Sequence, residues 1–198
     1  IESHAGQAEG VLTGYYEPVL RARRQPGAGY NVPLYAPPAG GAPRSAWYTR
    51  RQIDTDPAAQ AALQGRALLY LADPVDAMIL HVQGSGRVLV QEPDGSQRMV
   101  RMAFAGTNHH AFRSPSGWVI AQGGRGGSWD AIRQWIAQNP ARAQEAMWSN
   151  PRYVFFREEA IHSNEAASGP RGAQGVPLTP GRSIAVDRGS VPYGVPVW

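Results

Sequence analysis

Residues 81–106 read HVQGSGRVLVQE, then PDGS, then QRMVRMAFAG, and this stretch decides the fold. Two runs rich in β-branched and apolar residues flank a tetrapeptide of typical turn residues, which predicts a β-hairpin. Because side chains alternate along a strand, Val88, Val90 and Glu92 should share one face. Arg87, Leu89 and Gln91 should share the other.

Outside the hairpin, short elements separated by turn residues are predicted along the whole chain. Apolar β-rich runs predict strands over 11–20, ended by Pro18, and over 153–157, 183–187 and 193–198. Asp-Pro pairs at 56–57 and 73–74 mark helix starts, and Ser128 and Asn139-Pro140 begin a helix pair over 129–149. Residues 47–53 fit a short strand or a helix entry, and the segments 21–46 and 162–182 are expected to be loops. This pattern predicts a mainly β chain, a barrel or barrel-like fold with a few short helices.

Composition excludes several classes of chemistry. The 198 residues contain no Cys, and all 19 positive charges are Arg, so thiolate sites and Schiff-base lysines are ruled out. The net charge of +4 favours anionic partners. The only dense basic cluster, Arg21, Arg23 and Arg24, lacks interleaved aromatic residues, so we expect no nucleic-acid partner. No apolar run reaches membrane-spanning length, and both ends of the sequence read like those of a fragment.

The glycines around Ser85 allow two interpretations. Gly84-Ser85-Gly86 is too short for a dinucleotide fingerprint. It fits either a tight corner in a barrel strand or a bare backbone that a ligand approaches, with Gln83 and Ser85 donating to hydroxyls. The adjacent His109 and His110 would point to opposite faces of a strand. We therefore expect no metal site and no cofactor.

Carboxylates are the remaining candidates for catalysis, since cleavage of a glycosidic bond needs at least one acid. Glu17 and Asp187 end apolar runs and are the stronger candidates, although salt bridges or turn roles would also explain both. Asp73 and Asp76 are better explained as residues at a helix start. The many Trp and Tyr residues are compatible with stacking against sugar rings.

Six segments, taken together and in order, resemble the membrane-bound lytic murein transglycosylase A family of Gram-negative bacteria. They are LTGYYEPVL (12–20), LADPVDAMILHVQGSGRV (71–88), AFAGTNHHAFRS (103–114), NPRYVFFRE (150–158), GPRGAQGVPLTPGRSIAVD (169–187) and VPYGVPVW (191–198). The resemblance implies cleavage of the β-1,4 bond between N-acetylmuramic acid and N-acetylglucosamine without water, leaving a 1,6-anhydro sugar. It implies a peptidoglycan glycan strand as partner, and a protein on the periplasmic face of the outer membrane. We expect a monomer.

The family fold implied by the resemblance is a double-psi β-barrel with a second, β-barrel-like domain inserted. Residues 1–17 and 168–198 would be parts of the double-psi barrel, incomplete in this chain. Residues 18–167 would be the inserted domain, and the glycan would lie between the two. On this reading one wall of the groove carries Thr13, Tyr15, Tyr16 and Glu17, and the opposite wall carries Gln83, Gly84, Ser85 and Gly86.

The catalytic residue is not assigned within this sequence. The family's aspartate lies C-terminal to the segment that ends at Trp198, in a D-x-G-x-A-I-K-G motif, which leaves Asp187 and Glu17 as weak candidates. Two alternatives therefore stay open beside the transglycosylase. One is a non-catalytic peptidoglycan-binding module, and the other is a hydrolase that uses Glu17 and Asp187 as a carboxylate pair.

Overall fold

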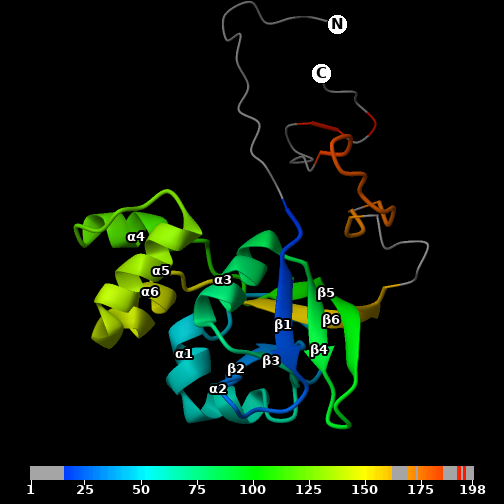
Figure 1. The fold of residues 1–198 in the computed structure, drawn as a ribbon, viewed down its shortest axis with the longest axis horizontal. Helices are drawn as coiled ribbons and strands as arrows, with labels where there is room; N and C mark the ends of the chain where they lie inside the picture. The colour runs from blue at the N-terminus through cyan, green and yellow to red at the C-terminus, as the bar shows by residue number, and fades with distance from the viewer. Residues whose placement is uncertain (1–15, 162–168, 173, 185–190, 193, 195–198) are drawn as a thin grey trace, which may run out of the picture.

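A six-stranded sheet curls into a nearly closed barrel in the computed structural model, which describes residues 16–161, 169–172, 174–184, 191, 192 and 194 (Figure 1). Its strands are β1 (Val19–Arg23), β2 (Val32–Tyr35), β3 (Ala67–Leu71), β4 (Gly86–Gln91), β5 (Gln97–Thr107) and β6 (Val154–Ala160), in the order β2-β3-β1-β4-β5-β6. The pair β1–β4 is parallel and the other pairs are antiparallel. The two edge strands, β2 and β6, lie close together. The hydroxyl of Tyr153, the residue before β6, donates to the Pro33 carbonyl of β2 at 3.4 Å.

The predicted hairpin is confirmed by β4, β5 and the turn between them. Val88 lies opposite Val100, and both side chains are buried in the barrel core with Val90. Leu34, Leu69 and other inward residues of the neighbouring strands complete this core. Removing these apolar side chains from water is the main force that holds the barrel together.

Four charged side chains form a network where β1, β4, β5 and β6 meet. Arg24 contacts Glu92 at 2.8 Å and Glu158 at 2.7 Å, and Arg98 contacts the same two carboxylates at 2.7 and 2.6 Å. The hydrogen bonds from Arg24 and Arg98 lower the pKa of Glu92 to about 2. The network joins the end of β1 to the β4–β5 turn and to β6.

Short helices cover the barrel in two groups. The helices α1 (Arg50–Thr55) and α2 (Pro57–Ala62) lie over a cluster formed by Ile53, Leu63, Tyr153 and Phe155. The second group comprises α3 (Pro74–Gln83), α4 (Pro115–Ala121), α5 (Trp129–Gln138), a 3₁₀ turn (Pro140–Arg142) and α6 (Ala143–Trp148). They pack on one another beside the barrel (Figure 1).

Three of the predicted helix starts are confirmed by their caps, whereas Asn139 makes no side-chain cap and Pro140 opens a 3₁₀ turn before α6. The carboxylates of Asp56 and Asp73 accept the backbone N–H of Ala58 and Val75, at 2.8 and 2.7 Å, and each is followed by proline in the first turn. Ser128 caps α5 by accepting the N–H of Ala131 at 3.1 Å. These caps satisfy backbone donors that have no partner within the helix.

Several predicted boundaries were wrong. Residues 81–83 belong to α3 and not to a strand, because the helix continues until Gly84, where φ is +78°. Pro18 precedes β1 and does not end a strand. The predicted loop over 21–46 contains the end of β1 and all of β2. Of the two alternatives for residues 47–53, the helix entry is confirmed, because α1 begins at Arg50.

Two elements, β3 and α4, were not predicted at all. The parts assigned to the double-psi barrel fall mostly outside the described residues, so that domain division stays a prediction. Within the residues that the structure describes, no helix combines the length and the apolar character needed to cross a membrane.

Candidate functional site

A hollow of about 620 Å³ lies between the start of β1, the helix α3 and the beginning of α5. We call it the groove. The β1 side contributes Tyr16, Glu17, Pro18, Val19 and Leu20, and the helices contribute Asp76, Ile79, Gly127, Ser128, Trp129, Asp130 and Arg133. The groove therefore lies where the start of one strand meets two helices, all from distant parts of the sequence.

Glu17 is held in place by two guanidinium groups. Its Oε2 accepts from Nε of Arg87 at 2.8 Å, and its Oε1 accepts from Nε of Arg101 at 2.7 Å. The two arginines lie directly opposite each other on β4 and β5, and the Arg101 side chain is only 3% exposed. Because like charges in a cross-strand pair repel, the carboxylate between them stabilises this part of the sheet. Glu17 therefore anchors the segment that enters β1.

Arg133 joins α5 to α3 at the base of the groove. Its guanidinium contacts the carboxylate of Asp73 and lies 2.5 Å from that of Asp76. Asp73 and Asp76 also occupy the cap and first turn of α3, as the sequence predicted. The ion pairs link α5 to α3 beside the apolar contacts of Ile132 and Trp135 with that helix.

The groove presents apolar surface and acidic oxygens side by side. Tyr16 is 48% exposed and Val19 is 66% exposed, and Trp129 is half-buried at the start of α5. Glu17, Asp76 and Asp130 supply carboxylates around them. Aromatic rings that face the C–H side of a sugar, with acceptors for its hydroxyls nearby, suit a carbohydrate better than an anion.

The glycine motif leads into β4 beside Pro18, which precedes β1, and the Arg87 N–H donates to the Pro18 carbonyl at 2.8 Å. The motif is therefore not across the groove from Pro18. Gly84 ends α3 in the left-handed region, with its N–H donating to the Leu80 carbonyl at 2.8 Å. Gly86 begins β4, where a Cβ would lie 2.5 Å from Leu80 Cδ1 and 3.0 Å from Pro18 Cγ. A helix-to-strand corner with close packing therefore explains both glycines.

The predicted binding residues are placed only in part. Tyr16 and Glu17 line the groove. Ser85 is buried, and Gln83 is the last residue of α3. Thr13, Tyr15 and Asp187 lie outside the described residues. Contacts of the motif from Gln83 to Gly86 with a ligand stay a prediction.

The sequence did not identify the helical side of the groove. Trp129 was noted only as one of many aromatic residues, and Asp130, Arg133 and Ile79 were not proposed as site residues. The one local signal is the glycine-rich run 123–127 directly before the Ser128 cap. The approach of α5 to β1 depends on packing against α3, which no local pattern reveals.

None of the three groove carboxylates has the surroundings of a proton donor. A glycosidase acid usually sits in an apolar pocket. Both oxygens of Glu17 accept from arginine, Asp76 pairs with Arg133, and Asp130 is exposed. The groove's own carboxylates are therefore poorly suited to protonate a leaving oxygen. Among the described residues, no cluster of three or more His, Asp or Glu could hold a metal ion.

The protein-family model described as the MltA specific insert domain matches this sequence over residues 11–157. The chain belongs to the MltA family. The membrane-bound lytic murein transglycosylase A of Vibrio cholerae is 32% identical in an alignment of 197 positions that covers 96% of this chain and 49% of that protein. The protein of the same name from Escherichia coli K12 is 32% identical over 92% of this chain and 47% of its own length. This chain thus spans about half the length of the curated relatives it matches.

Solved structures of the MltA family share this fold. The E. coli MltA structure with bound chitohexaose has a TM-score of 0.73 at 31% identity, covering 91% of this chain and 50% of that chain. The lytic transglycosylase LtgG of Burkholderia pseudomallei has a TM-score of 0.67 at 40% identity, covering 91% and 51%. The mainly β barrel with short helices agrees with the predicted fold class.

Proposed function

We propose that this chain is the part of a peptidoglycan lytic transglycosylase that holds the glycan strand, and that the groove is where the strand lies. The observation that carries the proposal is the groove itself, where exposed Tyr16 and Val19 and half-buried Trp129 lie beside carboxylates. Membership of the MltA family supports a lytic enzyme. The related E. coli protein that binds chitohexaose supports a glycan as the ligand.

The proposed reaction cleaves the β-1,4 bond from N-acetylmuramic acid to N-acetylglucosamine without water. The bond from the muramyl C1 to O4 of N-acetylglucosamine breaks, and an acid gives its proton to that oxygen. The muramyl O6 forms the new bond to C1 and loses its proton to the same group, now acting as a base. The product is a 1,6-anhydro sugar, and no further reactant is consumed.

The groove would contribute positioning rather than proton transfer. The attacking hydroxyl belongs to the same sugar ring as the carbon it attacks, so holding that ring in the reactive conformation supplies much of the rate enhancement. The acid in this proposal is the aspartate that the family resemblance places C-terminal to Trp198. The ion pairs of Glu17 and Arg133 would keep the walls of the groove fixed while the ring is bound.

The proposed setting is the periplasmic face of the outer membrane, where peptidoglycan is the available glycan. The curated relatives are named as membrane-bound, which supports a membrane-associated protein. The net charge of +4 would favour contact with stem-peptide carboxylates. That attraction is weak and falls as salt is added.

The second candidate is a peptidoglycan-binding unit without catalytic activity of its own. It is favoured by the paired state of Glu17 and Asp76 and the exposure of Asp130, which leave the groove without a suitable acid. A hydrolase that uses Glu17 with Asp187 has less support, because Glu17 is already bound by two arginines.

Mass spectrometry of peptidoglycan sacculi after incubation with the protein distinguishes these functions. A lytic transglycosylase releases muropeptides with 1,6-anhydro ends. A hydrolase releases reducing ends only, and that result would overturn the proposed chemistry. Sedimentation with sacculi in the absence of any released product would support the binding unit instead.

A further inference from the structure

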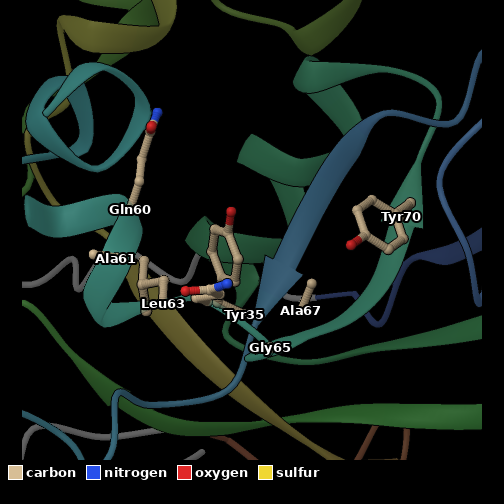
Figure 2. Close-up of a pocket in the computed structure, with 8 residues that line it drawn as sticks. Tyr35, Gln60, Ala61, Leu63, Gly65, Ala67 and Tyr70 are labelled. Carbon is tan, nitrogen blue, oxygen red and sulfur yellow. The ribbon is translucent and has the colours of Figure 1, made fainter. Parts of the chain in front are cut away.

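A second hollow, of about 400 Å³, lies on the outer surface of the barrel between β2, β3 and the end of α2 (Figure 2). Ligand pockets usually measure about 300 to 1,000 Å³, so it can hold a small ligand. Two tyrosines, Tyr35 and Tyr70, and two glutamines, Gln60 and Gln64, supply its polar groups. None of the residues that line it is charged.

The register of β2 and β3 places the two tyrosines on the outside of the barrel. Leu69 and Leu71 are fully buried in the core, so Tyr70 between them on β3 faces outward. The register shifts between Leu34 and Tyr35, and Tyr35 packs on the outer cluster, with its ring centroid 6.3 Å from that of Tyr153. Ala67 pairs with Tyr35 and lies between the two rings (Figure 2). Its methyl group leaves the space that a larger side chain would fill.

The polar groups of the hollow are neutral hydrogen-bonding groups. The Gln60 side chain donates through Nε2 to the Asp54 carbonyl at 2.8 Å, which fixes the amide and leaves its oxygen as an acceptor. Burial raises the pKa of Tyr35, so its hydroxyl stays protonated and can donate. Phosphates and carboxylates would find no cation here, whereas a neutral sugar would find rings and amides.

We propose that this hollow is a second saccharide-binding site that takes an N-acetylated hexosamine unit of a glycan. The C–H face of the sugar would pack on a tyrosine ring, as sugar rings do on aromatic side chains. The acetamido N–H would donate to a glutamine oxygen. The inference rests on the proposed function only for the identity of the sugar.

The second hollow is separate from the groove. Tyr70 pairs with Arg23 at the last residue of β1, whereas the groove lies at residues that precede and begin this strand. Four residues of extended chain separate Val19 from Arg23, or about 13 Å. A sugar bound in the second hollow would hold the protein on peptidoglycan without occupying the groove.

Amide chemical shifts of the isotope-labelled protein, titrated with di-N-acetylchitobiose, test both sites at once. We expect saturable shifts at Gly65, Ala67 and Tyr70, and a separate set at Val19, Gly127 and Trp129. Shifts in the groove set alone would overturn the second site and leave the proposed function standing. Shifts in the set at 65–70 alone would support the second site and count against the groove. No saturable shift in either set would contradict both.

Substitution of Tyr70 tests the role of its ring. Tyr70→Ala should weaken the binding measured at Gly65 and Ala67 at least about fivefold, while the groove shifts keep their wild-type affinity. Gln64→Ala is a second variant, which removes a side chain from the turn after α2, and we expect a smaller loss at the same signals. Tyr30→Ala is the control, because Tyr30 stacks on Arg23 outside the hollow. Equal affinity at Gly65 and Ala67 in Tyr70→Ala and in the wild type would overturn the proposal.

Discussion

Replacing Glu17 with glutamine tests whether this residue is a structural anchor. The substitution keeps the size of the side chain and removes the charge that lies between Arg87 and Arg101. The Glu17 side chain is 10% exposed and that of Arg101 is 3% exposed, so water can hardly replace the interaction that Arg101 loses. Breaking a buried ion pair typically costs about 3–5 kcal/mol, and we expect about 3 kcal/mol because Arg87 is partly exposed.

Urea unfolding followed by circular dichroism measures this free energy directly. At about 2–4 °C per kcal/mol for a chain of this size, Glu17→Gln should also lower the melting temperature by roughly 6–12 °C. The control is Glu145→Gln, which breaks an exposed pair with Arg142 and should change stability by less than about 0.5 kcal/mol. If the free energy of unfolding of Glu17→Gln is as close to the wild type as that of Glu145→Gln, Glu17 does not anchor the sheet.

Three further predictions concern acid stability and close packing. The pKa of Glu92 is about 2 against an ordinary value of 4.5. Its contribution to the free energy of unfolding is therefore complete above pH 4.5 and is lost as the pH falls toward 2. Glu92→Gln should flatten that part of a plot of unfolding free energy against pH. Burial lowers the pKa of His81 well below 6.5, so the unfolded chain takes up a proton at a higher pH than the folded chain. The free energy of unfolding should therefore fall as the pH drops below 6.5. A His81→Asn variant in which this free energy keeps the full wild-type slope from pH 7 to 5 would contradict the prediction. Gly86→Ala should lower the free energy of unfolding by about 1–3 kcal/mol because its Cβ would meet Leu80 at 2.5 Å, whereas Gly117→Ala, whose Cβ meets nothing closer than 3.6 Å, should be neutral or stabilising in urea melts.

Features set by neighbouring residues were predictable from the sequence. The hairpin of β4 and β5 follows from alternation around Pro93 to Ser96, and the starts of α2, α3 and α5 follow from their capping residues. The strand β2 was not predictable in this way, because it lies at an edge within a Pro- and Gly-rich segment. Its strand conformation depends on pairing with β3, where Pro33 opposite Tyr70 is tolerated.

The residues of the candidate site also fall into those that the sequence predicted and those that it did not. Tyr16 and Glu17 stood out because they flank an apolar run, and both line the groove. Trp129 and Arg133 lie more than a hundred residues away, and they reach the groove because α5 packs on α3, where Arg133 also binds Asp73 and Asp76. Residues 81–83 were predicted as strand but end α3, so the glycine motif is the corner between a helix and a strand: Gly84 ends α3 and Gly86 begins β4.

Calorimetric titration with chitohexaose tests the central claim, that the groove holds a glycan. We predict that the protein binds the hexasaccharide and that Trp129→Ala weakens binding at least about tenfold, since aromatic anchors usually dominate such contacts. Trp148→Ala should bind like the wild type, because Trp148 contacts Asp54 and Arg51 outside the groove. Equal affinity of Trp129→Ala and the wild type would contradict the account.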